Sequence, residues 1–327
     1  MKFTNYTNIP LSLAAYLADD TYDHNTDPTV ISATSLLNPL KSIILTRTIP
    51  IDGETDLASQ IASKVGTAIH DGIEDAWKNR PYSALKRLGY PEKVYSNIRI
   101  NPEVPGMASD INVYLEIRNQ KELSNGWIIS GKFDFVAEGQ LEDFKSKKVW
   151  AWIFKTKDDE FEFIAQGSIY RWLNPNIITE DTIAIDYLFT DWKANDAKKD
   201  KSYPQSQIIQ QKYPLMSLEK TERWLEHRTN EIDKYAGAAQ SDMPACTTAE
   251  LWQKAPVFKF YKDPKKTVRS TKNFPHLSAA QVHQANLGGI GIIKEFKGEV
   301  KRCHYCSASP VCQQRESLEL SGLLKPL

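Results

Sequence analysis

Apolar residues recur at intervals of four between Asp56 and Trp77, which is close to the helical period of 3.6. This recurrence predicts an amphipathic helix that buries one apolar stripe. Two further helices are expected over about 160–173 and about 217–235, and Asn174-Pro175 would end the first of these. The stripe of the first helix consists of Leu57, Ile61, Val65, Ile69 and Ile73.

β-Branched and aromatic residues are concentrated in short segments that predict strands. Glu138-Gly139 separates two of these segments and suits a hairpin turn, so we expect antiparallel pairing there. The last segment is apolar throughout, which is typical of a strand buried on both faces. The segments are 113–117, 127–136, 140–146, 148–154 and 182–189.

The order helix, strands, helix, strand predicts an α/β core, with a mixed central sheet flanked by helices. Residues 1–54 are rich in Asn, Thr and Pro, and we expect an irregular arm with one short helix. The core would occupy 55–240, interrupted by a polar stretch at 193–207. Residues 241–327 would form a C-terminal subdomain of short elements and loops.

The composition is that of an ordinary globular protein, with 41 basic and 41 acidic residues among 327. Zero net charge excludes a uniformly basic DNA-coating protein but not a basic groove balanced elsewhere. There is no run of about 18 apolar residues and no basic segment followed by a long apolar run at the N-terminus. We therefore expect no membrane span, no export and a cytoplasmic location.

Two carboxylates are expected to lie together on the predicted hairpin. Side chains alternate across a strand, so Asp143 and Lys145 share one face while Phe144 enters the opposite, apolar side. The hairpin would bring Asp134 close to Asp143, and two neighbouring carboxylates are costly unless a cation lies between them. Mg²⁺ or Mn²⁺ would suit this site, because both take oxygen ligands and bridge to phosphate oxygens.

Two helices add polar side chains at helical spacing. Gly66, His70 and Glu74 follow one another at i, i+4 and lie along one edge of the first helix. His70 would offer a nitrogen ligand, and Gly66 would permit a close approach. Gln166 and Tyr170 put an amide and a phenol on one face of the second helix, where they would reach DNA.

Six of these positions follow the motif order of PD-(D/E)XK nucleases. The chain resembles most closely the RecB-type branch, which includes Cas4-like and phage-type exonucleases, over about 31–190 and, through the cysteines, to the C-terminus. The motifs are His70 in GTAIH, Asp134 in GKFD, Asp143 and Lys145 in EDFK, and Gln166 with Tyr170 in QGSIY.

The resemblance implies a restriction-endonuclease-like core and divalent-metal-dependent hydrolysis of DNA. It also implies a role for each matching residue: His70, Asp134 and Asp143 would bind metal, Lys145 would be the catalytic lysine, and Gln166 and Tyr170 would contact substrate. Taken singly, each position has a plainer interpretation as a structural histidine, a solvated Asp-x-Lys or a core cap, and it is their joint order that favours the nuclease.

Two neighbouring patterns are set aside. Glu142 points away from Lys145 in a regular strand and receives no metal role. The segment 126–132, GWIISGK, nearly matches a phosphate-binding loop, but Phe133 stands where a hydroxyl must reach Mg²⁺. No helicase motor is therefore expected.

The four cysteines lie in the last quarter of the chain, which suggests a metal site rather than a disulfide scaffold. Four thiolates suit a [4Fe-4S] cluster or a tetrahedral Zn²⁺, and unliganded thiols are the third alternative. The pattern resembles the iron–sulfur staple of Cas4 and AddB nucleases, except that the isolated cysteine here follows the nuclease motifs. The staple would thus close a C-terminal subdomain. The residues are Cys246 and the C-x2-C-x5-C set Cys303, Cys306 and Cys312.

The densest basic run of the chain lies between the cysteines. Residues 259–272 carry six basic residues against Asp263, and Lys265, Lys266 and Arg269 are its centre. Such a run is commonly a solvated loop, but here it would contact DNA, with bases stacking on neighbouring aromatic rings. The rings are those of Phe258, Phe260 and Tyr261.

The sequence therefore predicts a metal-dependent DNA exonuclease acting on ends or single strands. The phage-type resemblance implies DNA recombination, repair or end processing in the host cytoplasm, beside a single-strand annealing or single-strand-binding protein. The competing hypothesis is a DNA-binding or adaptor protein that keeps the core and the cysteine subdomain but has lost catalysis. Divalent-metal dependence of cleavage separates the two.

Overall fold

The chain divides into two compact units, and each is described by itself. Unit 1 comprises residues 1–37 and 50–231, and unit 2 comprises 38–49 and 232–327. A short N-terminal segment thus belongs with the C-terminal residues, which differs from the predicted boundaries after 54 and 240. The structure is a computed structural model that describes residues 2–19, 27–49, 54–104 and 109–325.

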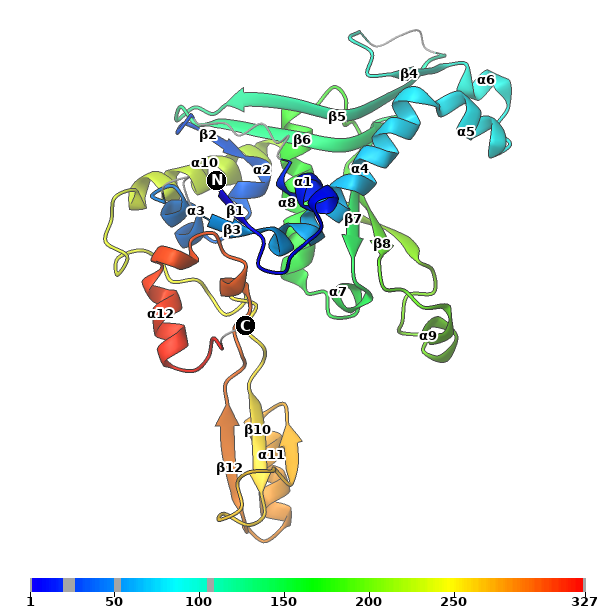
Figure 1. The fold of residues 1–327 in the computed structure, drawn as a ribbon. Helices are drawn as coiled ribbons and strands as arrows, with labels where there is room; N and C mark the ends of the chain where they lie inside the picture. The colour runs from blue at the N-terminus through cyan, green and yellow to red at the C-terminus, as the bar shows by residue number, and fades with distance from the viewer. Residues whose placement is uncertain (1, 20–26, 50–53, 105–108, 326–327) are drawn as a thin grey trace. The chain divides into compact units, whose positions relative to one another are not determined.

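Unit 1 is built on a mixed seven-stranded sheet (Figure 1). In chain order its elements are β1 (Lys2–Thr4), α1 (Leu11–Ala18), β2 (Val30–Ser32), α2 (Ala33–Leu36), β3 (Glu54–Asp56), the 3-10 helix η1 (Leu57–Gln60), α4 (Ile61–Asn79), α5 (Pro81–Arg87), α6 (Glu92–Tyr95), β4 (Ile98–Ile100), β5 (Ile111–Glu122), β6 (Ile128–Ala137), β7 (Gln140–Lys147), α7 (Val149–Ile153), α8 (Lys157–Leu173), β8 (Thr182–Phe189), α9 (Ala194–Lys199), β9 (Ile208–Pro214) and α10 (Leu218–Tyr235), which runs on into unit 2.

The strand order of the sheet is β4-β5-β6-β7-β8-β9, and β2 pairs with β6. Strands β5, β6 and β7 are antiparallel, as the sequence predicted. Glu138 and Gly139 turn the β6–β7 hairpin with φ of 49° and 80°, the positive values that a tight hairpin turn needs. Strands β7 and β8 are parallel and are joined through α8, so the centre of the unit is an α/β arrangement.

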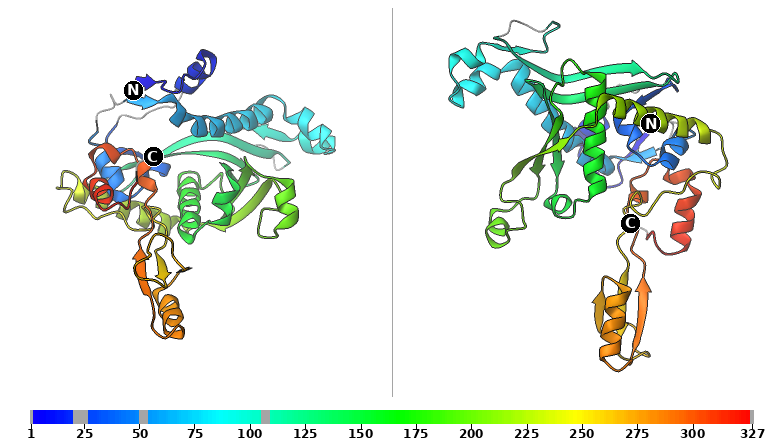
Figure 2. Two further views of the ribbon diagram at one scale, coloured as in Figure 1. Left: turned by 60° about the horizontal axis from the view of Figure 1, so that its bottom comes forward. Right: turned by 180° about the vertical axis from the view of Figure 1, so that it is seen from behind.

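Helices α4 and α8 cover opposite faces of this sheet (Figures 1 and 2). Helix α8 begins at a capping box in which Thr156 and Asp159 bond each other's backbone N–H, and its second half is almost wholly buried. Helix α4 meets the other face, where Trp77 packs on Phe135 with 5.1 Å between ring centroids. The predicted core is therefore confirmed as a mixed α/β fold with helices on both faces.

Several predicted features are wrong in detail. No residue of α4 is fully buried, and Ile61 and Val65 are about half exposed, because only one side of the helix lies on the sheet. The predicted strand 148–154 is the helix α7, because the partner strand β8 ends where Phe189 pairs with Lys147. The chain then turns away, with Val149 N–H donating to Asp191 Oδ1 (2.7 Å).

The N-terminal residues and the polar stretch are also more regular than predicted. The described part of 1–54 holds α1, α2 and α3 (Leu40–Thr46) instead of one short helix. The stretch 193–207 contains α9, and strand β9 follows it without having been anticipated.

Unit 2 combines α3 with the C-terminal elements. Lys41 Nζ of α3 donates to the Gln240 carbonyl (2.9 Å), and Arg302 donates to Asn38 Oδ1 (3.0 Å). A three-stranded sheet with the order β11-β10-β12 carries its own helix. The elements are β10 (Val257–Tyr261), β11 (Lys272–Phe274), α11 (Leu277–Asn286), β12 (Ile292–Phe296), the 3-10 helices η2 (Arg302–His304) and η3 (Ser309–Val311), and α12 (Gln313–Leu320).

Among the described residues, no helix has both the length and the apolar character that crossing a bilayer requires.

Two glycines in helices should respond in opposite ways to the same substitution. A Cβ at Gly167 of α8 would lie 2.8 Å from Leu215 and 2.9 Å from Ile183, so Gly167→Ala should destabilise unit 1 by about 1–3 kcal/mol through overpacking. A Cβ at Gly72 of α4 meets nothing within 4 Å, so Gly72→Ala should stabilise by about 0.5–1 kcal/mol through helix propensity. Urea denaturation measures both; shifts of the same sign would contradict the packing argument.

Candidate active site and cysteine pocket

The candidate active site lies where β6 and β7 part. These strands pair only over the three residues next to their turn. Further along, side chains take over the backbone groups of Phe144: its N–H donates to Asp134 Oδ2 (3.0 Å), and its carbonyl oxygen lies 3.0 Å from His70 Nε2. Because backbone groups inside a sheet need partners, these bonds fix both side chains in the gap.

His70, Asp134 and Glu116 form a three-residue cluster. His70 Nδ1 lies 3.5 Å from Asp134 Oδ2 and 3.9 Å from Glu116 Oε1. One ligand atom from each of the three lies within 4.8 Å of the other two. The cluster therefore has the compactness and the donor types of a divalent-cation site.

Sequence analysis did not identify Glu116. The β5–β6 register places it directly opposite Asp134, since Leu115 pairs with Phe135 and Ile117 with Phe133. Glu116 also has a φ of 55°, a left-handed conformation that is strained for a residue with a side chain. Carboxylates facing each other across two strands repel, so this position indicates a cation between them. Only the strand register, which the sequence alone did not supply, would have revealed it.

Charges within the cluster stabilise the protonated histidine. Hydrogen bonds to Asp134, and then to Glu116, raise the pKa of His70 to about 10. Burial raises the pKa of Glu116, but hydrogen bonds from His70 and Lys132 outweigh it, and the net pKa is lowered. The protein without a metal thus keeps an imidazolium between two carboxylates, the position that a cation would take.

Asp143 and Lys145 lie beside this cluster on β7, and they share one face as predicted. The Asp143 side chain is 1% exposed, and its Oδ2 is 2.7 Å from Lys145 Nζ. Burial raises the pKa of Asp143 to about 6 against the opposing effect of Lys145. Burial lowers the pKa of Lys145, but Asp143 and Asp134 more than offset this, so the ammonium is retained.

Gln166 and Tyr170 of α8 support Asp143 from the other side. Gln166 Nε2 donates to Asp143 Oδ1 (3.2 Å) and to the Tyr170 hydroxyl (2.9 Å). Both residues are buried. The pair therefore orients Asp143, and its contact with a substrate stays a prediction.

The remaining predicted neighbours take no part in the cluster. Glu74 is ion-paired with Lys78, and Gly66 lies against Ser146, whose Oγ is 3.4 Å from an added Cβ. Glu142 points to the opposite face of the sheet, where burial and then Asp186 raise its pKa to about 7.

The donor set fits a hard divalent cation. Two carboxylates and one imidazole converge at the cluster, and a third carboxylate lies next to them on β7. The Asp143 Oδ2 atom is buried with no hydrogen bond of good geometry among the described residues, despite its nearness to Lys145. Such an atom has room in its coordination for a metal. The segment resembling a phosphate-binding loop leads into strand β6 and forms no loop of that kind.

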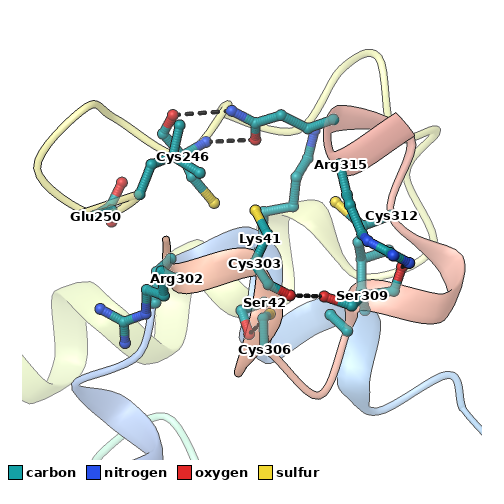
Figure 3. A pocket seen from close by; sticks show the side chains of 15 residues that line it. Lys41, Ser42, Cys246, Glu250, Arg302, Cys303, Cys306, Ser309, Cys312 and Arg315 are labelled. Carbon is teal, nitrogen blue, oxygen red and sulfur yellow. Dashed lines mark hydrogen bonds between the residues drawn. The ribbon is translucent and has the colours of Figure 1, made fainter. Parts of the chain in front are cut away.

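The four cysteines line one pocket in unit 2 (Figure 3). Their sulfurs stand around this pocket, whereas the tight three-ligand set of the described chain is the His70 cluster. Burial first, then Glu250 and the other cysteines, raise the pKa of Cys246 to about 12. No disulfide links the four thiols.

The pocket is completed by the N-terminal helix α3. Ser42 Oγ lies 3.2 Å from Cys306 Sγ, and Lys41 and Ser42 both line the pocket. The expectation that the cysteines close a purely C-terminal subdomain is therefore wrong, because a segment more than 200 residues earlier is part of the same unit. Arg302 and Arg315 also line the pocket and bring positive charge to the thiols.

The basic run lies between β10 and β11. Lys265, Lys266 and Arg269 are exposed there, as a solvated loop or a DNA contact would require. The neighbouring rings do not form the predicted stacking surface. Phe260 and Tyr261 are 0% and 2% exposed, and Phe258 packs into the cluster beneath α11, because strand alternation turns these rings into the small core.

Comparisons with known proteins add little. No protein family and no curated protein matches the sequence. Among solved structures, one titled "Crystal structure of SSO0001" aligns over 67% of this chain and 84% of its own, with 11% identity and a TM-score of 0.39. At that TM-score the likeness carries no argument.

The pH dependence of stability tests the state of His70. Its folded pKa of about 10 exceeds the reference value of 6.5, so its stabilisation is fully present below pH 6.5 and is lost as the pH rises towards 10. The difference in unfolding free energy between wild type and His70→Asn, measured by urea denaturation in EDTA, should therefore shrink across this interval. Other titrating groups cancel in the difference. A difference that stays constant would show that His70 is not held as an imidazolium.

Proposed function

We propose that this protein is a divalent-metal-dependent deoxyribonuclease of the PD-(D/E)XK type, with a RecB-like, phage-type exonuclease as the nearest functional class. The observation that carries the proposal is the buried Asp143–Lys145 pair beside the His70, Glu116 and Asp134 cluster. A nuclease of this kind needs an acidic metal site and a neighbouring ammonium, and these residues supply both.

The chemistry assigned to the site is hydrolysis of a phosphodiester bond. A divalent cation bound by His70, Asp134 and Asp143, with Glu116 as a further oxygen donor, would acidify a water and neutralise phosphate charge. Lys145 remains protonated and so would orient the attacking water or offset the developing negative charge. Gln166 holds Asp143 in place through Oδ1 and leaves Oδ2 for the metal side.

The cysteine pocket is proposed to hold a [4Fe-4S] cluster, with Zn²⁺ as the alternative. Tetrahedral thiolate zinc places its sulfurs about 3.8 Å apart. The four sulfurs here surround a pocket, which suits a larger inorganic core. The positive side chains of Arg302 and Arg315 would balance the thiolate charge. The cluster would tie α3 to the C-terminal elements.

The proposed substrate is DNA, as ends or single strands, within recombination, repair or end processing. A single-strand annealing or single-strand-binding protein would be the partner, and the site of action would be the cytoplasm of a host cell. These proposals rest on the sequence resemblance described above. The adaptor alternative has no observation in its favour, because the charged groups that catalysis needs are all in place.

Cleavage should depend on one face of β7. Asp143→Asn and Lys145→Ala should each lower Mg²⁺- or Mn²⁺-dependent degradation of end-labelled linear DNA by roughly 10³-fold or more, because each removes a group that acts on the transition state. Glu142→Gln, next in the chain but on the opposite face, should keep wild-type activity. Thermal melting checks that all three fold.

Closed circular DNA and EDTA complete this assay. Degradation of linear but not circular DNA would identify an exonuclease. Cleavage that persists in EDTA, or in both variants, would contradict the proposed site. DNA binding without any cleavage would favour the adaptor alternative.

The cysteine pocket predicts a coloured protein. Purification without oxygen should give about four iron and four sulfide per chain with visible absorption, as a [4Fe-4S] cluster requires. Cys306→Ala should lose most of both, whereas Tyr305→Ala, whose exposed ring stands beside Cys306, should keep them. One equivalent of zinc without sulfide would establish the alternative, and a metal-free folded protein would refute both.

A further inference from the structure

The small sheet of unit 2 has one covered and one open face. Helix α11 lies against one side of β10, β11 and β12 (Figures 1 and 2). Phe260, Phe274 and Ala280 are buried between helix and sheet, and Phe258 and Ile293 pack around them. Strand alternation then places the intervening residues on the side away from α11.

A cationic row crosses this open face. The register pairs Lys259 of β10 with Lys294 of β12 on one side and with Asn273 of β11 on the other. Two lysines directly opposite each other repel and weaken the pairing of their strands. Neither forms an ion pair with an acidic residue in the described part of the chain; instead each ammonium lies over a ring, Lys259 at 4.2 Å from Phe296 and Lys294 at 5.9 Å from Tyr261.

The charge of this module is strongly one-sided. Residues 257–296 contain seven basic and two acidic residues, a net charge of +5. The whole chain is neutral, so the remainder carries −5. One of the two acids, Asp263, lies near Lys266 (3.9 Å) within the loop, away from the lysine row. A concentrated positive patch on an acidic protein is arranged for a polyanion.

We propose that the open face of the β10–β12 sheet, centred on Lys259 and Lys294, binds a DNA strand through its phosphates. Phosphates would take the position between the two ammonium groups and relieve their repulsion. The adjoining basic loop with Lys265, Lys266 and Arg269 would extend the contact. The exposed Phe296 ring, 41% accessible, offers a surface for a base.

This inference rests on the proposed function for its choice of DNA as the polyanion, but it is tested by binding alone. The probe is a fluorescent single-stranded oligonucleotide, with anisotropy measured in EDTA at several salt concentrations so that no cleavage occurs. Lys259→Gln with Lys294→Gln should lower the slope of log affinity against log salt by about 2, one for each lost phosphate contact. The melting temperature should stay the same or rise, because the repulsion is gone.

A matched control separates local contact from net charge. Lys198→Gln with Lys199→Gln removes the same two charges from exposed positions on α9 and should leave the affinity and the slope unchanged. An equal loss in the control, or no loss in the Lys259/Lys294 variant, would overturn the proposal, as would binding of anionic phosphatidylserine vesicles in place of DNA. Cleavage that survives while the Lys259/Lys294 variant binds normally would reject only this inference; DNA binding at this face without cleavage would reject only the nuclease.

Discussion

The burial of the Asp143 carboxylate is the constraint around which unit 1 is arranged. An ionised carboxylate taken out of water costs several kcal/mol unless it is paired and hydrogen-bonded. Lys145 supplies the charge and Gln166 one hydrogen bond, and together they tie β7 to α8. Replacing such a pair by apolar residues is often neutral or stabilising. The pair is therefore a poor device for stability, and its place beside two further carboxylates favours chemistry as its purpose.

The parting of β6 and β7 links this pair to the metal cluster. A hairpin that paired along its whole length would satisfy the Phe144 backbone with its neighbouring strand and would leave no role there for Asp134 and His70. Because the ladder stops early, these side chains bond to Phe144 instead, and α4 on one face of the sheet thereby reaches a site that α8 supports from the other. The site is thus held by the same hydrogen bonds that complete the sheet.

Local patterns in the sequence located much of this site, and the failures have physical causes. Strand alternation placed Asp143 with Lys145, and the Glu138-Gly139 turn brought Asp134 near them, because both arguments need only neighbouring residues. Glu116 required the β5–β6 register, which no local pattern carries. Residues 148–154 have strand composition but lack a partner strand, so they fold as α7. Phe258 and Phe260 looked like an exposed stacking surface until α11 was found to cover them.

Zero net charge conceals the division of labour within the chain. A buried acidic site cannot by itself attract a polyanion, since its carboxylates repel phosphate until a cation is bound. The excess of basic residues in 257–296 is sufficient to supply the missing attraction, and the remainder of the chain is acidic by the same amount. A nuclease organised in this way would separate the capture of DNA from its hydrolysis: capture would weaken with salt through the lysines of the small sheet, whereas hydrolysis would depend on the divalent cation at β7.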